Sequence, residues 1–279
     1  MYLPKPIDDF LHSAEMKQVY EGMSAADVYR CQISRDGQKQ YYYLKVEPWN
    51  SEVENEHKLY QWLYEKGKLP VPKPFFCIRE NEKHSLQQYT FDKDKHEKAI
   101  DTGYLLLECA KGEILRNEKY YRNPQKLAEL AAEGIQLLWQ VDLTDCPTLG
   151  KLEWQLKLAE QNLRAGNFES LAPDIPYTKD FANHTQLFDF LVKNQPKEEL
   201  VFTHGDYCLN NFFTDGKQIT AFIDFGRGGA GDGYQDIALC IRELMEYCPE
   251  AIPLFYEKLG IKHPDQDKLR YYMLLDELF

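Results

Sequence analysis

The segment VFTHGDYCLNNFFTDGKQITAFIDFGRGG, residues 201–229, places acids and amides among short apolar runs. Asp206 follows an apolar strand pattern at 200–203 and is expected on a loop. An Asp-Gly pair between two further apolar runs predicts a hairpin, so Asn211 and Asp224 are expected side by side at its open end. Asparagine and aspartate oxygens suit Mg²⁺, and a third carboxylate can accept a proton. Phosphoryl transfer requires these parts.

The spacing Asp206-x4-Asn211 also matches the catalytic-loop pattern of protein kinases. His204 is an alternative base, but we interpret it as structural, because a histidine can hold such a loop by bonding a backbone carbonyl. A Ser/His/Asp hydrolase is disfavoured because no G-x-S-x-G pattern occurs. Either motif alone, HGD-x4-N or IDFGR, could be an ordinary polar loop. The two motifs joined by a hairpin predict a metal site.

A nucleotide clamp is the next requirement, and the first half of the chain offers candidates. Neither a Walker A pattern nor G-x-G-x-x-G occurs. The stretch EGMSAADV at 21–28 could cover phosphates with its backbone N–H groups and Ser24. Lys45 ends an apolar strand pattern and Glu56 lies on the next predicted helix, as in the pair that holds the α- and β-phosphates in protein kinases. The alternative is that both are ordinary surface charges.

The elements around these residues change in character along the chain. Before residue 109 we predict a hairpin and further strands with one helix, at 28–33, 41–46, 53–64 (the helix), 75–78 and 104–107. A charged stretch between the last two strands is expected to be solvated. After Gly112 we predict mainly helices, at 126–143, 154–166, 185–194 and from Tyr234 onward. The expected fold is α+β and bilobal, with a nucleotide-binding lobe over 1–108 and a catalytic and substrate-binding lobe over 109–279.

The amino-acid composition limits the binding partners and the cellular location that we expect for the protein. Forty-five acidic against 33 basic side chains give a net charge of −12, which disfavours nucleic acid and suits a small cationic substrate. The first 25 residues hold no long apolar run, so neither a signal peptide nor a membrane span is expected. The seven cysteines form no C-x-x-C pair, which favours free thiols in the cytoplasm. We expect a monomer or a dimer.

Together these residues resemble the aminoglycoside phosphotransferases, most closely the aminoglycoside 3′-phosphotransferases. The likeness extends over nearly the whole chain and includes EGMSAADVY, LLLECAKG, ELVFTHGD, FIDFGR, YQDIALCIRE and YYMLLDELF. The resemblance implies a protein-kinase-like bilobal fold. It also implies transfer of the γ-phosphate of ATP, with Mg²⁺, to an antibiotic hydroxyl, which gives antibiotic resistance.

The resemblance further implies a role for each matching residue. Asp206 is the catalytic base, and Asn211 and Asp224 are the Mg²⁺ ligands. Tyr43 stacks on adenine, while the backbone of Glu108 and Ala110 binds its edge. The full set of implied nucleotide-binding residues is Met23, Ser24, Tyr43, Lys45, Glu56, Glu108 and Ala110. The implied substrate-binding residues are Arg227, Glu246, Asp276, Glu277 and Phe279.

Three departures from the family pattern stand out. The loop at 79–103 is longer than usual, and Trp139 stands in place of a histidine. The segment at 164–183 carries few acids where a richly acidic substrate loop is expected, which leaves the identity of the aminoglycoside open. A kinase of another small amine or alcohol, choline-like, or of a peptide antibiotic is the alternative. A catalytically silent nucleotide-binding module is disfavoured by the presence of Lys45, Asp206, Asn211 and Asp224.

Overall fold

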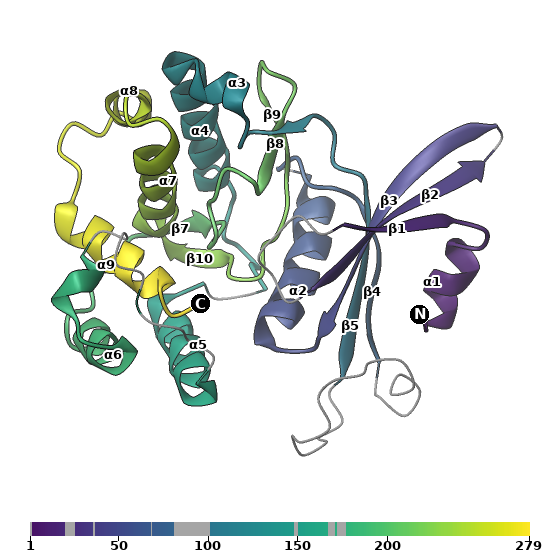
Figure 1. Ribbon diagram of the computed structural model, residues 1–279, viewed down its shortest axis with the longest axis horizontal. Helices are drawn as coiled ribbons and strands as arrows, with labels where there is room; N and C mark the ends of the chain where they lie inside the picture. The colour runs from purple at the N-terminus through teal and green to yellow at the C-terminus, as the bar shows by residue number, and fades with distance from the viewer. Residues whose placement is uncertain are drawn as a thin grey trace.

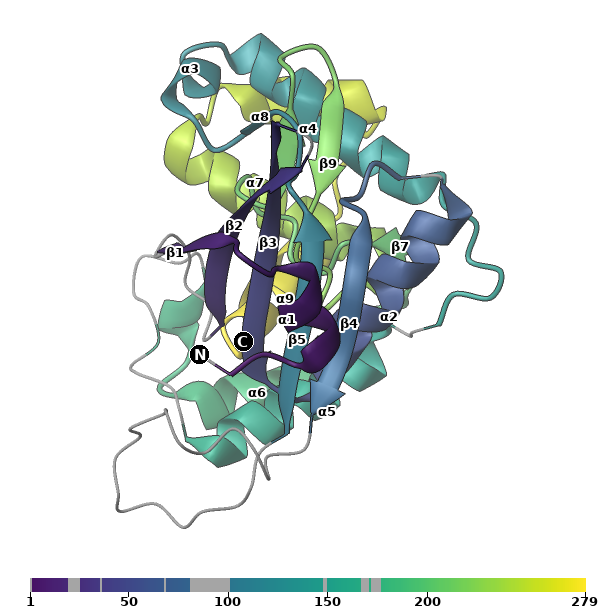
Figure 2. The same cartoon turned by 90° about the vertical axis from the view of Figure 1, so that its right-hand side faces the viewer.

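The first part of the protein is an antiparallel sheet with two helices. The computed structural model describes residues 2–19, 26–35, 37–67, 69–80, 101–147, 150–166, 171 and 177–279. The sheet has the strand order β1-β2-β3-β5-β4 (Figure 1). Its elements are α1 (Lys5–Phe10), β1 (Glu15–Val19), β2 (Asp27–Arg35), β3 (Gln38–Pro48), α2 (Ser51–Lys66), β4 (Pro74–Glu80) and β5 (Thr102–Glu108). Helix α2 lies between this sheet and the rest of the molecule, whereas α1 covers the opposite face (Figures 1 and 2).

The alternation of side chains along β3 decides which residues face α1. Tyr42, Leu44 and Val46 are buried in an apolar cluster with residues of α1, β2 and β5. Because successive side chains of a strand point to opposite faces, Tyr43 and Lys45 lie on the face turned away from α1. The sheet thus presents these two side chains towards α2 and the second part of the chain.

The second part is mainly helical and holds short strands. Its elements are β6 (Glu113–Ile114), α3 (Glu118–Tyr121), α4 (Pro124–Trp139), α5 (Leu152–Ala165), the 3₁₀ turn η1 (Thr178–Asp180), α6 (His184–Lys193), β7 (Leu200–Thr203), β8 (Phe212–Thr214), β9 (Ile219–Phe222), β10 (Gly229–Asp232), α7 (Gly233–Tyr247), α8 (Ala251–Leu259) and α9 (Gln266–Asp276). Strands β8 and β9 form an antiparallel hairpin beside β6, and β10 pairs with β7. These strands carry the loops of the candidate site.

Two apolar clusters organise the interior. The smaller one joins α1 to the sheet. The larger one spans the helical part and also takes in Leu59, Tyr60 and Leu63 of α2 and Leu105 and Leu107 of β5. Helix α2 begins with Asn50, whose side chain accepts hydrogen bonds from the N–H groups of Glu52 and Val53, both at 2.9 Å, as expected of a helix N-cap. The inner face of α2 therefore packs into the core of the helical part.

Most predicted elements are confirmed, with their ends shifted by a few residues. The prediction missed α1, β1, β6, α3 and β10, which are short or lack a clear apolar period. Met23, Ser24 and most of the predicted charged excursion lie outside the described residues. In the part of the chain that the structure describes, no helix combines the length and apolar character needed to span a membrane.

Candidate functional site

The loop that carries Asp206 is fixed by hydrogen bonds with side chains of α7. Both carboxylate oxygens of Asp236 accept backbone hydrogen bonds, from His204 N–H at 2.8 Å and from Gly205 N–H at 2.9 Å. Gln235 Nε2 donates to the Gly205 carbonyl at 3.0 Å. Asp236 is fully buried, and this burial raises its pKa to about 7, although the two N–H donors act to lower it. The loop is thereby fixed at three successive peptide groups.

Gly205 and His204 complete this support. Gly205 has a φ of 84°, and a Cβ there would lie 2.2 Å from the Arg227 carbonyl oxygen, so only glycine fits. The buried His204 ring has Nε2 at 2.7 Å from the Ile223 carbonyl, and its Nδ1 accepts the Asp206 N–H at 3.3 Å. This network assigns the ring proton to Nε2. Burial lowers the pKa of His204, so the neutral ring acts as a link between Asp206 and the loop after β9.

Asp206 is surrounded by hydrogen-bond donors. Asn211 Nδ2 donates to the backbone carbonyl and to Oδ2 of Asp206, each at 2.9 Å. Arg227 Nη2 lies 3.0 Å from Oδ1, and the Cys208 thiol donates to the same oxygen at 3.2 Å. The side chain of Asp206 is 32% exposed, so a solute can still reach it. The structure thus brings Asp206 and Asn211 into direct contact, as the sequence pattern predicted.

Lys45 is the second centre of the site. Its Nζ lies 2.8 Å from Glu56 Oε2, 3.3 Å from Glu47 Oε1 and 3.3 Å from Asp224 Oδ1. Burial alone would lower the pKa of Lys45, but the three carboxylates raise it well above its ordinary value. The predicted pair of Lys45 and Glu56 is therefore formed, and Lys45 connects the sheet to α2 and to the loop after β9.

Asp224 follows β9 in a left-handed conformation, with a φ of 62°. An aspartate tolerates this region better than most residues, and such strain is often found at functional sites. Its backbone N–H donates to the Tyr60 hydroxyl at 3.2 Å. Asn55 Nδ2 donates to the carbonyls of Gly226 and Gly228, both at 2.9 Å. Helix α2 therefore holds the loop after Asp224 at two places.

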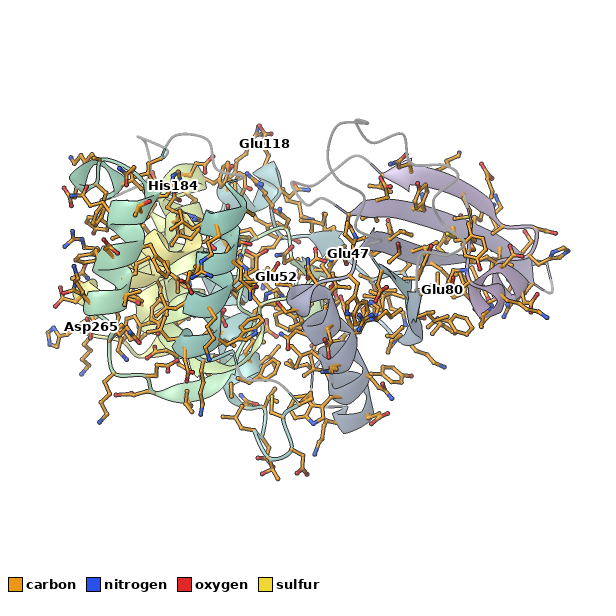
Figure 3. All side chains as sticks on the ribbon, turned by 90° about the horizontal axis from the view of Figure 1, so that it is seen from below. Glu47, Glu52, Glu80, Glu118, His184 and Asp265 are labelled. Atoms are coloured by element: carbon orange, nitrogen blue, oxygen red, sulfur yellow. The ribbon has the colours of Figure 1, made fainter. Side chains whose placement is uncertain are left out.

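Figure 3 shows the region where α2 contacts the loop after Asp224. Glu47 and Glu52 lie where the sheet and α2 meet the helical part. A Cβ on Gly226 would lie 3.5 Å from the Cβ of Glu52, so the first turn of α2 is packed directly on the loop after Asp224. The described acids around Lys45 thus come from β3, from α2 and from the loop after β9.

Asn211 and Asp224 fit the requirements of a Mg²⁺ site. Because both hydrogen bonds of the Asn211 side-chain nitrogen go to Asp206, the amide oxygen is the atom left to act as a ligand. The Asp224 side chain is 45% exposed, and one of its oxygens lies beside Lys45. Within the described ranges no group of three or more His, Cys, Asp or Glu side chains is arranged to hold a metal ion by itself. This small donor set suits Mg²⁺, which takes one or two protein ligands together with substrate phosphates.

The remaining nucleotide candidates lie on the central strand β3, at the end of β5 and in the segment that follows it. Tyr43 is two residues before Lys45 on the same face of β3. Glu108 ends β5, and its N–H donates to the Lys73 carbonyl at 2.9 Å. The Ala110 N–H has no backbone acceptor among the described residues. The Ala110 N–H is therefore available to a ligand, whereas the Glu108 N–H is already used.

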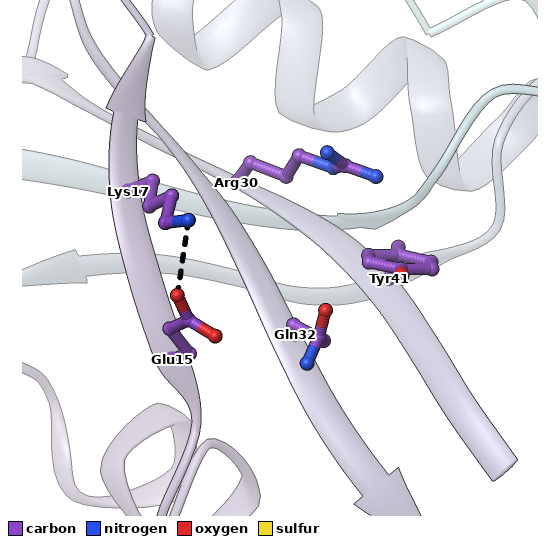
Figure 4. A pocket seen from close by; sticks show the side chains of 5 residues that line it. All are labelled: Glu15, Lys17, Arg30, Gln32 and Tyr41. Carbon is purple, nitrogen blue, oxygen red and sulfur yellow. Dashed lines mark ion pairs between the residues drawn. The ribbon is translucent and has the colours of Figure 1, made fainter.

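Two surface cavities are lined by residues of the sheet and of the segments beside it, and Asp206 lines neither of them. One of about 50 Å³ is lined by Glu15, Lys17, Arg30, Gln32 and Tyr41, and the Arg30 guanidinium stacks at 4.3 Å on the Tyr41 ring (Figure 4). Another of about 430 Å³ is lined by residues that include Glu108 and Cys109. Only Glu108 among the predicted site residues borders either one. The candidate site is therefore identified by side chains that come together around Asp206 and Lys45, and not by a cavity.

Arg227 connects the predicted substrate residue Asp276 to Asp206 by ion pairs with both. Arg227 Nη1 lies 2.5 Å from Asp276 Oδ1, and the centre of its guanidinium lies 4.7 Å from the Phe279 ring. Glu277 directly follows α9, and Glu246 is exposed on the last turn of α7. The structure brings Arg227, Asp276 and Phe279 together beside Asp206, whereas no contact joins Glu246 to this group among the described residues.

Four supporting residues were not predicted from the sequence, namely Asn55, Gln235, Asp236 and Arg242. Each lies inside an amphipathic helix, where polar residues are common. Asp236 is fully buried, but it lies in the first turn of α7, where an acid also favours the helix dipole, so its position in the sequence gives no separate signal. Burial is not visible in a single sequence, so these residues could be assigned only from the structure.

Comparison with known proteins agrees with this geometry. The profile of the phosphotransferase enzyme family matches residues 17–272. An aminoglycoside 3′-phosphotransferase from Enterococcus faecalis is 36% identical over 272 residues, covering 93% of this chain and 91% of that protein.

Solved structures show the same fold. A crystal structure of an aminoglycoside 3′-phosphotransferase of type VIII superimposes with a TM-score of 0.76 at 24% identity, covering 99% of this chain and 97% of the other. An aminoglycoside phosphotransferase from Streptomyces rimosus, solved with ADP and streptomycin, has a TM-score of 0.70 at 22% identity and covers 98% and 95%. The family match, the relative at 36% identity and the shared fold lead to one conclusion: the chain belongs to the aminoglycoside 3′-phosphotransferases of the phosphotransferase enzyme family.

Proposed function

We propose that this protein transfers the γ-phosphate of ATP to a hydroxyl group of an aminoglycoside and thereby inactivates the antibiotic. The observation that carries the proposal is the contact of Asp206 with Asn211, formed next to a Lys45 that is paired with both Glu56 and Asp224. A dianionic phosphate spoils the fit of a polycation to an anionic RNA target, which explains why the reaction gives resistance.

Asp206 acts as the base in this proposal. The acceptor hydroxyl lies against its carboxylate, and the hydroxyl proton passes to Asp206 as the oxygen attacks the γ-phosphorus. The bond from this phosphorus to the bridging oxygen of the β-phosphate breaks, and ADP leaves. His204 does not compete for this role, because its ring is buried and both ring nitrogens are already engaged. Asn211 orients the carboxylate through Oδ2, so that the acceptor approaches from the exposed side.

Lys45 and Glu56 position the phosphates, with Glu56 keeping the Lys45 ammonium in place. Asn211 and Asp224 would hold Mg²⁺, which neutralises charge on the phosphates when bound. We assign the adenine to Tyr43 and to the backbone of Glu108 and Ala110. Met23 and Ser24 are proposed to cover the phosphates on the strength of the family resemblance alone.

The substrate side is proposed to comprise Arg227, Glu246, Asp276, Glu277 and Phe279, with Glu246 and Glu277 meeting ammonium groups and Asp276 supporting Arg227. Acidic side chains suit a polyamine, because they form charge-assisted hydrogen bonds with ammonium groups. The net charge of −12 also attracts a cationic antibiotic. We further propose that residues 1–108 and 109–279 act as the nucleotide and substrate lobes. The reaction is assigned to the cytoplasm, where the seven free cysteines stay reduced.

The test is a coupled assay of ADP formation with a panel of aminoglycosides, run beside Asp206→Asn. We expect the wild type to turn over at least one aminoglycoside and the variant to lose ~10² to 10⁴ in kcat, the range for general-base catalysis. Nucleotide binding by the variant should be retained. Absence of turnover with every aminoglycoside refutes the function, and turnover with choline or a peptide antibiotic instead favours the alternative. Full activity of Asp206→Asn refutes the role of the base.

A further inference from the structure

Four charged side chains form a continuous chain from α7 to the catalytic loop. Arg242 Nη1 lies 2.6 Å from Asp276 Oδ2, and Asp276 Oδ1 lies 2.5 Å from Arg227 Nη1. The other terminal nitrogen of Arg227 lies 3.0 Å from Asp206 Oδ1. Charges therefore alternate in sign over the whole distance from Arg242 to Asp206.

The middle of this chain is shielded from solvent. The side chains of Asp276 and Arg227 are only 12% and 13% exposed, and the Phe279 ring covers the Arg227 guanidinium. Burial would raise the pKa of Asp276, but the two guanidiniums lower it below its ordinary value, so its carboxylate is charged. Buried ion pairs of this kind fix geometry, because removing one partner leaves an uncompensated charge.

Both oxygens of Asp276 are occupied by guanidinium groups. An ammonium group of the substrate would have to displace one of two short ion pairs before it could bind there. The same contacts divide the charge of Arg227 between two carboxylates. Without Asp276, the whole guanidinium charge would act on Asp206 and would compete with the acceptor hydroxyl for Oδ1.

We propose that Asp276 is a positioning residue that acts through Arg227 and does not bind an ammonium group of the substrate itself. It holds the Arg227 guanidinium at Asp206 with part of its charge neutralised, so that the base keeps its orientation and still accepts the substrate hydroxyl. This inference rests on the proposed function of Asp206, and it separates the role of Asp276 from that of Glu277 on the next position.

The first experiment compares Asp276→Asn with Glu277→Gln in steady-state kinetics. We expect Asp276→Asn to lower kcat by about tenfold or more with little change in the aminoglycoside KM, the pattern of an interaction used only in the transition state. Glu277→Gln should instead raise the aminoglycoside KM. Rates are normalised to the nucleotide-binding stoichiometry, so that partial unfolding does not count as lost turnover. A raised aminoglycoside KM with unchanged kcat in Asp276→Asn overturns the inference.

A double-mutant cycle tests the route through Arg227. In an Arg227→Gln background, Asp276→Asn is expected to change kcat less than about twofold, because the intermediary is already absent. Effects that multiply in the double variant contradict the inference. Should Asp276→Asn fail to fold, the cycle is run with Asp276→Glu, which keeps the charge but displaces it and should lose part of kcat. A wild type that phosphorylates no aminoglycoside refutes the proposed function, whereas an active wild type with independent effects refutes only this inference.

Discussion

Asn55 offers a direct test of how α2 supports the site. Its side chain is buried and donates to the carbonyls of Gly226 and Gly228 at 2.9 Å. The substitution Asn55→Leu keeps a similar volume and removes both donors, which leaves two carbonyls without this partner. A buried polar group left unsatisfied costs ~1 to 3 kcal/mol. Taking the lower end for each carbonyl, we expect the free energy of unfolding to fall by about 2 kcal/mol.

The loop that these bonds hold also carries Asp224 and Arg227, so the loss should extend to catalysis. A displacement of about 1 Å in a catalytic group can cost up to ~10² in rate. We therefore expect kcat of Asn55→Leu to fall by at least about tenfold, with a higher Mg²⁺ requirement. Urea denaturation gives the stability, and a Mg²⁺ titration of kcat gives the functional effect.

Thr214→Val provides the matched control. Thr214 is also buried, and its hydroxyl donates to the Gln218 carbonyl at 2.7 Å and accepts from Gly216 N–H at 2.9 Å, in a hairpin turn away from the site. We expect a similar loss of stability with kcat unchanged. If both variants are destabilised alike and Asn55→Leu keeps its kcat and Mg²⁺ dependence, the role given to Asn55 is wrong.

Other parts of the structure give three further predictions. Asp224→Ala should abolish the Mg²⁺ dependence of nucleotide affinity, and an unchanged Mg²⁺ titration of ATP binding would contradict its assignment. Burial lowers the pKa of His57 to about 4, so between pH 6.5 and pH 4 the unfolded chain binds a proton that the folded chain does not. Stability therefore falls as the pH drops, by about 2 kcal/mol at pH 5 from this residue, and His57→Gln should flatten that slope in urea denaturation at several pH values. Gly205→Ala should lose turnover because its Cβ meets the Arg227 carbonyl. Gly216→Ala has a similar φ of 85°, and its Cβ would meet only the Tyr120 hydroxyl at 3.8 Å, so it should lose only about 1 to 2 kcal/mol of stability; equal turnover in the two variants would count against the clash.

The sequence allowed the central hairpin to be predicted because its signals are local. The Asp-Gly turn and its flanking apolar runs specify β8 and β9, and the hairpin then brings Asn211 near the loop of Asp224. Lys45 and Glu56 were predicted from their positions on consecutive elements, and their contact at 2.8 Å agrees with that pattern.

Long-range support could not be predicted in the same way. Strand β10 has the sequence GAGD, which carries no strand propensity, and it forms only because β7 provides a partner. The ion pairs of Asp276 with Arg227 and Arg242 join residues far apart in the chain, and nothing local in LLDEL distinguishes Asp276 from Glu277. Tertiary packing decides such contacts, and a single sequence contains no record of it.

The position of α2 has a consequence for motion. Its inner face belongs to the apolar cluster of the helical part, and Asn55 and Tyr60 bond the loop around Asp224. Leu105 and Leu107 of β5 belong to the same cluster, so the sheet is joined to α2 and to the helical part by apolar packing as well. Lys45 adds charged contacts from β3 to Glu56 on α2 and to Asp224 after β9. We therefore expect the sheet and α2 to move together, with the Lys45 ion pairs kept intact through the catalytic cycle.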